Sequence, residues 1–364
     1  MIPRPTPCLT LVALLVGPLL ADGLLAAPAG PAGGPPVRKL APGVEQTIPV
    51  DREEEETSAV HDVVELTVGK PDLKWTPQEY EESLTLFRRA QQSIFRRGIW
   101  QVQITFKPLR MIAVDLPQPN GKMKTEMVWY IVYRITNPGG HLTPVQGTPT
   151  EKEGQFHPGE WKIERSDRHQ KMHAQAGPHL FTPLFLLRTH RDQRLAVDDS
   201  SVEHLDVILP AARRAIYRRE RPNCSLEQFY DSARMSLAEV PPSTGRDEAS
   251  RYGVVTWIHV DRPLGPDGKL DMNRRVDVDF FTVQIMGLTN AYRWEDPAGA
   301  FRPGNPHGTG RQFEYKTLEF TFYRPGDEFE AREDEIRWGV PGHRRYRWLY
   351  RPALTTFQPH RPQL

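Results

Sequence analysis

The residues best suited to chemistry are the histidines of the segment HQKMHAQAGPH, which begins at His169. His169 and His173 lie four residues apart, and His179 follows them. Two imidazoles at this spacing on a helix can hold one metal ion, as they do in metalloproteases. Those enzymes also need a glutamate directly after the first histidine, where this chain has Gln170. A polar loop therefore explains the segment better, and His169 and His173 stay as the candidate metal ligands.

A second cluster that could do chemistry is the acidic stretch within residues 324–339. Clustered carboxylates can bind calcium or act as an acid–base pair. Their spacing matches no calcium-binding loop, so a turn at Pro325 and Gly326 followed by a solvated edge is the better interpretation. The carboxylates are those of Asp327, Glu328, Glu330, Glu333, Asp334 and Glu335.

No further segment carries a catalytic signature. The sequence lacks a glycine-rich phosphate loop, a Gly-x-Ser-x-Gly elbow and a cysteine/histidine metal knuckle. Tyr346, Trp348 and Tyr350 alternate with arginines, which predicts rings facing a core and guanidinium groups facing water. The formal net charge of +1 gives no basis for a nucleic-acid partner. The sequence therefore predicts no catalytic residue and no cofactor, leaves catalysis uncertain and favours a protein that is not an enzyme.

The first 29 residues have the pattern of an export signal peptide. Arg4 supplies a positive start, an apolar run of 13 residues follows at 8–20, and Ala27-Pro28-Ala29 is a small-x-small cleavage site. If the segment is not cleaved, it could instead anchor the protein in a membrane. We therefore expect an exported protein, located in the periplasm, at the cell surface or outside the cell. Cleavage would leave Cys224 as the only cysteine, expected to be buried as a small apolar side chain.

The rest of the chain is predicted to be mainly β-structure with some helix. Residues 30–75 are rich in proline, glycine and acidic residues, which is typical of a disordered linker. The 35 prolines and 27 glycines of the whole chain suit turns and edge strands better than long helices. Capping signals and apolar periodicity predict helices at 77–97, 210–220 and 225–240. Ser225 opens the last of these as part of a capping box with the glutamine three residues later.

Three short motifs occur in the same order in both halves of the chain, about 150 residues apart. The pairs are Val114-Asp115-x-Pro117 with Val260-Asp261-x-Pro263, Asn120-Gly121-Lys122 with Asp267-Gly268-Lys269, and Thr136-Asn137 with Thr289-Asn290. Asn-Gly and Asp-Gly both favour type I′ hairpin turns, so the match preserves backbone conformation as well as letters. The motifs predict a divergent duplication; the alternative is two unrelated hairpins with common turn chemistry.

A duplication predicts two tandem immunoglobulin-like β-sandwich domains. The first would span 76–240 and carry the added helices, and the second would span 253–352. A linker at 241–252 would join them, and a tail at 353–364 would follow.

Alignment of the strands that end in Thr-Asn assigns a face to each side chain. One face is apolar in both copies and is expected to line each core. It consists of Val128, Tyr130 and Val132 in the first copy and Phe281, Val283 and Ile285 in the second. The opposite face consists of Trp129, Ile131 and Tyr133 in the first copy and Thr282, Gln284 and Met286 in the second. We therefore expect helices or a domain interface to cover this face in the first domain, and water to contact it in the second.

The segments VWYIVYRITN, GLTNAYRW and TLEFTFYRPGDEFEAREDEIRWG resemble an uncharacterised exported protein family of planctomycete-type bacteria. The resemblance implies export and a β-rich body, and it carries no catalytic residue to transfer. We expect a non-catalytic binding or cell-envelope structural module whose partner is a protein or a cell-envelope component. The alternative is a metal-assisted hydrolase with a site at the domain interface, built from His169, His173 or the acidic stretch.

Overall fold

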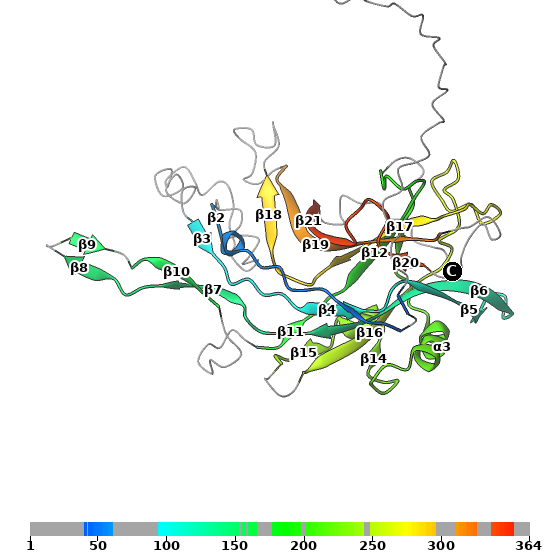
Figure 1. Cartoon of the computed structure of the whole chain (residues 1–364), viewed down its shortest axis with the longest axis horizontal. Coiled ribbons are helices and arrows are strands. Elements are labelled where there is room, and N and C mark those ends of the chain that lie inside the picture. Colours follow the sequence, from blue (N-terminus) through cyan, green and yellow to red (C-terminus); the bar gives the residue numbers. More distant parts are fainter. Residues whose placement is uncertain are drawn as a thin grey trace, which may run out of the picture. The chain divides into compact units, whose positions relative to one another are not determined.

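The computed structural model describes ten stretches of the chain: 40–41, 43–60, 94–152, 155–157, 159–165, 177–197, 201–243, 248–295, 310–325 and 336–352. All of them belong to one compact unit, Pro35–Leu364. The protein is mainly β, as predicted, and Figure 1 shows its strands and the helix α3. The predicted signal peptide at 1–29, most of the 30–75 linker and the tail after Pro352 lie outside the described residues.

The first sheet is built around β6 (Met123–Thr136), a strand of 14 residues. One edge of β6 pairs with β5 and β4, and its other edge pairs with β16, all antiparallel. The outer neighbours are β1, which is antiparallel to β4, and β14, which is parallel to β16. The bounds are β1 (Gln46–Thr47), β4 (Gln103–Phe106), β5 (Arg110–Pro117), β14 (Phe229–Tyr230) and β16 (Ser250–Trp257).

The second sheet is built around β19 (Gln312–Tyr323). One edge of β19 pairs with β17 and β18, and its other edge pairs with β20 and β21. β12 continues the sheet beyond β17, and β13 follows β12. The bounds are β12 (Leu184–His190), β13 (Glu203–Leu205), β17 (Phe280–Met286), β18 (Tyr292–Glu295), β20 (Arg337–Trp338) and β21 (Tyr346–Pro352).

Among the described strands, four short two-stranded ribbons accompany these sheets (Figure 1). All four are antiparallel. Their strands are β2 (Ser58–Val60) with β3 (Ile94–Arg96), β7 (Leu142–Gln146) with β10 (Trp161–Arg165), β8 (Thr150–Lys152) with β9 (Gln155–His157), and β11 (His179–Leu180) with β15 (Glu239–Val240). A 3₁₀ turn, η1 (Glu54–Thr57), precedes β2.

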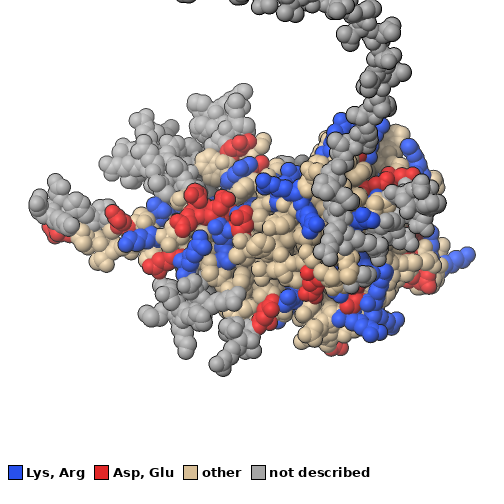
Figure 2. Space-filling model, viewed as in Figure 1, with Lys and Arg blue, Asp and Glu red and all other residues tan. Residues whose placement is uncertain are grey.

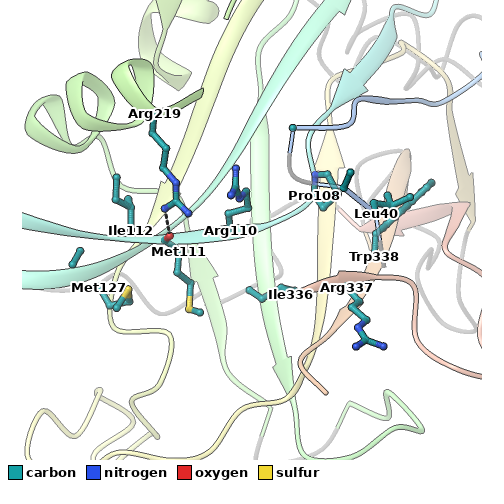
Figure 3. Close-up of a pocket in the computed structure, with 13 residues that line it drawn as sticks. Leu40, Pro108, Arg110, Met111, Ile112, Met127, Arg219, Ile336, Arg337 and Trp338 are labelled. Atoms are coloured by element: carbon teal, nitrogen blue, oxygen red, sulfur yellow. Dashed lines mark hydrogen bonds between the residues drawn. The ribbon is translucent and has the colours of Figure 1, made fainter. Parts of the chain in front are cut away.

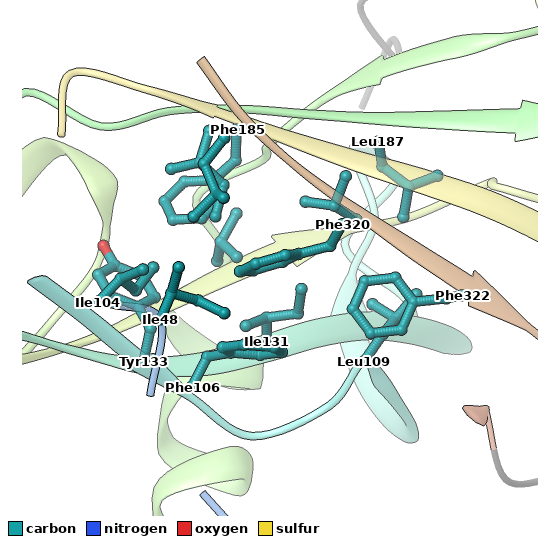
Figure 4. Close-up of a cluster of buried hydrophobic side chains, with 14 of the residues drawn as sticks. Ile48, Ile104, Phe106, Leu109, Ile131, Tyr133, Phe185, Leu187, Phe320 and Phe322 are labelled. Atoms are coloured by element: carbon teal, nitrogen blue, oxygen red, sulfur yellow. The ribbon is translucent and has the colours of Figure 1, made fainter. Parts of the chain in front are cut away.

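The main core fills the space between the two sheets. Figure 4 shows Phe106 and Ile131 of the first sheet facing Phe320 and Phe322 of the second. The rings of Phe106 and Phe320 are stacked with centroids 4.2 Å apart. Complete burial of such a side chain stabilises the fold by about 1.5–3 kcal/mol. The pairing of two sheets across one apolar layer makes the protein a β-sandwich.

Helix α3 (Pro210–Glu220) covers the other face of the first sheet. Ala212 and Ile216 of the helix pack in one cluster with Val128, Tyr130 and Val132 of β6. Both faces of β6 are therefore buried, and a helix covers one of them, as the sequence predicts. The assignment of the faces was wrong, however. Trp129, Ile131 and Tyr133 face the second sheet in the main core, and the Val128 face contacts the helix.

The corresponding strand of the second half, β17, also differs from the expectation. Phe281, Val283 and Ile285 line the main core as predicted. Thr282 and Gln284 on the opposite face are each only 3 % exposed, so water does not cover this face. Two of its polar groups are bonded locally: the amide nitrogen of Gln284 donates to Glu319 over 2.5 Å, and the hydroxyl of Thr282 bonds His190 over 2.9 Å.

The two halves of the chain share both sheets. β6 of the first half pairs with β16 over eight residue pairs, from Trp129↔Trp257 to Thr136↔Ser250. β12 of the first half pairs with β17 over seven. The linker expected at 241–252 includes residues 250–252, which are the start of β16, a strand in the middle of the first sheet. The two tandem sandwiches expected from the repeat are replaced by one, because each half supplies strands to both sheets.

The two turn motifs of the predicted repeat have the same geometry. In each turn, the glycine N–H donates to the backbone oxygen of the residue three positions earlier. The distance is 2.9 Å from Gly121 to Gln118 and 3.0 Å from Gly268 to Gly265. Only the glycines have positive φ, 77° and 74°, so these are not the type I′ turns that were predicted. The strands around them also differ, because β5 and β6 form one hairpin whereas β16 and β17 lie in different sheets.

The predicted helices have mixed outcomes. Residues 210–220 form α3 as predicted. Residues 225–240 do not form one helix: β14, the four-residue α4 (Ser232–Met235) and β15 occupy them. Ser225 and Gln228 still make the reciprocal bonds of a capping box, over 3.3 and 3.4 Å, but around a turn. Of the helix predicted at 77–97, residues 77–93 lie outside the described residues, and Ile94–Arg96 form β3 instead.

Candidate functional site

A cavity of about 390 Å³ lies at one edge of the sandwich, between β5 of the first sheet and β20 of the second. β5 pairs only with β6, and β20 only with β19, among the described strands. The two edge strands belong to different sheets and do not pair with each other, so the space between the sheets stays open here. Leu40, Ala41, Gly43 and Pro108 complete the wall. Figure 3 shows Met111 and Ile336 approaching from opposite sides of this space.

The wall of this cavity, which we call the edge cavity, is largely apolar. Trp338 joins this wall to the main core: the indole packs edge-on against Phe106, with centroids 5.3 Å apart, and the residue is 7 % exposed. Met127 is 49 % exposed and lies at the surface. The apolar side chains that line the cavity are Leu40, Ala41, Pro108, Met111, Ile112, Ala113, Met127, Ile336 and Trp338.

The charged side chains of the edge cavity are all arginines. Arg110 comes from β5, Arg219 from the last turn of α3, and Arg337 from β20. Among the described residues, no Asp or Glu side chain lines the cavity. Arg219 donates to the backbone oxygen of Met111 over 2.6 Å, the bond drawn in Figure 3. A guanidinium group has five N–H donors, so this bond leaves Arg219 further donors for a bound molecule.

Glu220, next to Arg219, orients Arg110 from behind the cavity. Its carboxylate accepts bonds from Arg110 over 2.7 Å, from Tyr130 over 2.6 Å and from Lys107 over 3.1 Å. Burial alone would raise the pKa of Glu220, but the bond from Tyr130 and the charges of Arg110 and Lys107 outweigh it and lower the pKa. Glu220 is therefore ionised at neutral pH and holds Arg110 in a fixed orientation.

A smaller hollow of about 270 Å³ adjoins the edge cavity and shares Met111 and Met127 with it. Its charged groups have both signs, unlike those of the edge cavity. Its polar lining consists of Glu126, His259, Asp261, Arg275, Asp277 and Arg324. His259 has a φ of 59°, in the left-handed region that a side chain rarely adopts. The mixed charges give this hollow no single preferred ligand class.

The face of the molecule drawn in Figure 2 shows no field of one sign. On this face, basic and acidic side chains are interspersed, in line with the formal net charge of +1. The all-arginine lining of the edge cavity is therefore a local feature.

The histidines predicted as metal ligands, His169 and His173, lie outside the described residues, as does the acidic stretch from Asp327 to Glu335. The third histidine of that segment, His179, is described and pairs with His141, with 3.1 Å between their Nε2 atoms. Burial, the neighbouring His179 and Arg52 lower the pKa of His141 to about 4. Within the part of the chain that the structure describes, no group of three or more His, Cys, Asp or Glu side chains could hold a metal ion.

Sequence reasoning missed both the edge cavity and His141. The arginines of the cavity are more than 100 residues apart, and only the pairing of strands brings them together. His141 lies 38 residues before His179, and no periodicity relates the two. One local signal was present: Gly139 and Gly140 directly before His141 mark a chain reversal.

The sequence also predicted the surroundings of the aromatic residues of β21 and of Cys224. Tyr346 and Trp348 pack against the main core, whereas Arg345 and Arg347 are exposed, as the alternation predicted. Tyr350, also predicted to face the core, lies outside that cluster and donates its hydroxyl to Glu56 over 2.8 Å. Cys224 is half-buried beside the α3 cluster rather than fully buried, and burial raises the pKa of its thiol.

Comparisons with models of known protein families, with curated proteins and with solved structures find no match to this chain. In the described part of the chain, no helix has the length and apolar character needed to cross a membrane.

Proposed function

We propose that this protein is an exported, non-catalytic binding module whose edge cavity holds a small amphipathic anion. The observation that carries the proposal is the lining of the cavity, in which three arginines and no carboxylate meet an apolar wall. Its volume of about 390 Å³ is within the roughly 300–1,000 Å³ of typical ligand pockets. Such a site suits a molecule with an apolar body and a carboxylate, sulfate or phosphate group.

The two parts of the cavity have different roles in binding. The guanidinium groups of Arg219 and Arg337 would pair with the anionic group, because charge-assisted bonds from arginine suit carboxylate and phosphate oxygens. The aromatic and methionine side chains would contact the apolar body, and methionine adapts its shape to different ligands. Arg110 is held by Glu220 and contributes positive charge at a fixed position.

Export and the cell-envelope partner remain parts of the proposal. They rest on the pattern of residues 1–29 and on the resemblance to an exported bacterial family. A cell-envelope component with an apolar chain and an acidic group would fit the edge cavity. The β-sandwich architecture is shared with many binding modules, immunoglobulin-like domains among them, and supports this role by analogy of architecture alone. The duplication also stays a prediction.

The hydrolase alternative needs His169, His173 or the acidic stretch, all outside the described residues. No contact among the described residues favours it over binding.

The proposal is tested by calorimetric titration with three ligands of equal chain length: octanoate, octan-1-ol and octyltrimethylammonium. We expect octanoate to bind at least about tenfold more tightly than the alcohol, because a charged hydrogen bond contributes about 1.5–3 kcal/mol. The ammonium compound should bind weakest. R219Q and R337Q should each reduce the preference for octanoate over the alcohol.

The matched control is R194Q, because Arg194 is 85 % exposed and bonds Asp192, away from the cavity. This variant should bind octanoate like the unaltered chain. Equal affinity for the acid and the alcohol, or loss of binding in R194Q as large as in R219Q, would refute the proposal.

A further inference from the structure

The pair His141 and His179 lies apart from the edge cavity and has its own supporting structure. His141 follows Gly139 and Gly140, whose φ values of 70° and 66° reverse the chain after β6. Arg52 donates to the backbone oxygen of Gly139 over 2.9 Å and also to that of Gly140. Asn137 accepts the N–H of Gly139 over 3.1 Å. The backbone that carries His141 is thus fixed from two sides, and the imidazole is only 3 % exposed.

His179 is fixed in a different way. Its ring is stacked on Trp100, with centroids 4.6 Å apart and planes 11° from parallel. Its backbone starts β11, where it pairs with Val240 of β15. The two imidazole rings meet almost at right angles, with 79° between their planes.

The two imidazoles approach each other through their Nε2 atoms. The 3.1 Å between these atoms matches two ligands of one ion, because nitrogens at about 2.0–2.1 Å from a zinc ion and 3.1 Å apart subtend about 100° at the metal. We propose that His141 and His179 form a two-histidine site for a divalent transition-metal ion, with water or a small ligand in the remaining coordination positions.

The chemistry of the site selects the kind of ion. The two protein donors are imidazole nitrogens, which suit zinc, nickel and copper, whereas calcium and magnesium take oxygen ligands. Arg52 helps to lower the pKa of His141, and its positive charge disfavours any divalent cation, so the affinity must come from the imidazole–metal bonds that transition metals form. The ordinary order of affinities places copper(II) above nickel(II) and zinc(II) at such a site. The other reading of the same contact is an imidazole–imidazole hydrogen bond without a metal.

The test is titration of the untagged full-length chain with CuSO₄, NiCl₂ and ZnCl₂, followed by calorimetry and tryptophan fluorescence. We expect one ion per chain, tightest for copper(II), and quenching of the Trp100 emission, since His179 is stacked on that ring. H141N and H179N should each weaken binding at least about tenfold. W100F should keep the binding and lose most of the quenching.

The matched control is H343N, because His343 is an exposed histidine elsewhere in the chain. It should leave both stoichiometry and affinity unchanged. His179 is half-buried, so H179N provides a test even if H141N does not fold. Electron paramagnetic resonance of the unaltered chain with copper(II) should show two nitrogen ligands. The proposal is overturned by the absence of stoichiometric binding, or by binding that survives in H179N and is lost only when His169 or His173 is replaced.

Discussion

Glu220 connects helix α3 to the first sheet through one buried carboxylate. Its side chain is 2 % exposed and bonds Lys107, Arg110 and Tyr130. In E220Q, Lys107 and Arg110 would lose their charged partner while staying partly buried. We expect unfolding free energy at pH 7 to fall by about 3 kcal/mol, the usual cost of breaking a buried ion pair. Chemical denaturation with guanidinium chloride measures this loss.

The stability that Glu220 contributes should also depend on pH. The pKa of Glu220 is lower in the folded protein than the ordinary value of 4.5. Its contribution is therefore present above pH 4.5 and is lost as the pH falls through the folded pKa, because the unfolded state binds the proton more tightly. The difference in stability between E220Q and the unaltered chain should shrink as the pH is lowered from 7 to 3. A constant difference over that range would contradict an ionised Glu220.

At the residue scale, the sequence predicts local chemistry well and distant partners poorly. The capping bonds of Ser225 and Gln228 form as their spacing predicts. Turns with a positive-φ glycine also form at 121 and 268, because a positive φ is a local property, but they are not of the predicted type I′. His141 and the arginines of the edge cavity could not be found in this way, since their meeting depends on which strands pair.

At the element scale, the pairing of β6 with β16 depends on Gly253. This glycine lies opposite Tyr133, and a Cβ atom there would be 2.6 Å from the tyrosine oxygen and closer still to Cζ. We expect G253A to destabilise the protein by about 1–3 kcal/mol, the typical effect of overpacking a core. Thermal unfolding measures the effect.

G177A is the control, because nothing lies within 4 Å of a Cβ atom at Gly177. It should leave the melting temperature nearly unchanged. In a Y133L background, leucine leaves more room for the Cβ atom that G253A adds. G253A should therefore lower the stability less in that background than in the unaltered chain. A loss in G253A no larger than in G177A would show that these two strands do not pack as described.

The predictions for β6 show why pattern alone fails at this scale. Its residues are apolar on both sides, so the sequence correctly predicts that both faces are covered. Alternation cannot say which face meets a helix and which a sheet, and the alignment with β17 assigned them the wrong way round. Residues 225–240 failed for a related reason: Phe229 and Tyr230 pair with β16, and this tertiary pairing outweighs the helical periodicity.

At the scale of the whole molecule, both halves of the chain should unfold together. Trp129 of the first half and Phe281 of the second contact each other, with ring centroids 5.0 Å apart in the main core. We expect one calorimetric transition for the full chain, with equal calorimetric and van't Hoff enthalpies. F281A should shift that transition as a unit while costing about 3–5 kcal/mol. Two transitions, of which F281A lowers only one, would instead support separate domains.

The sequence could predict a β-rich protein, but it could not predict that each half of the chain supplies strands to both sheets. The turn motifs at 118–122 and 265–269 are alike in sequence and geometry, which suggested that their strands also pair alike. The second motif instead joins strands of different sheets, with a loop between Trp257 and Phe280 that is long enough to cross from one sheet to the other. Local turn chemistry does not determine which sheet a following strand joins.

The central claim is that strands from both halves of the chain form one cavity that binds amphipathic anions. Hydrogen–deuterium exchange with and without octanoate tests it most directly. We expect octanoate to slow exchange in two segments at once, residues 110–113 of β5 and residues 336–338 around β20, which line the cavity from the two sheets. Unchanged exchange in both segments under saturating octanoate, or slowing in one alone, would contradict the account.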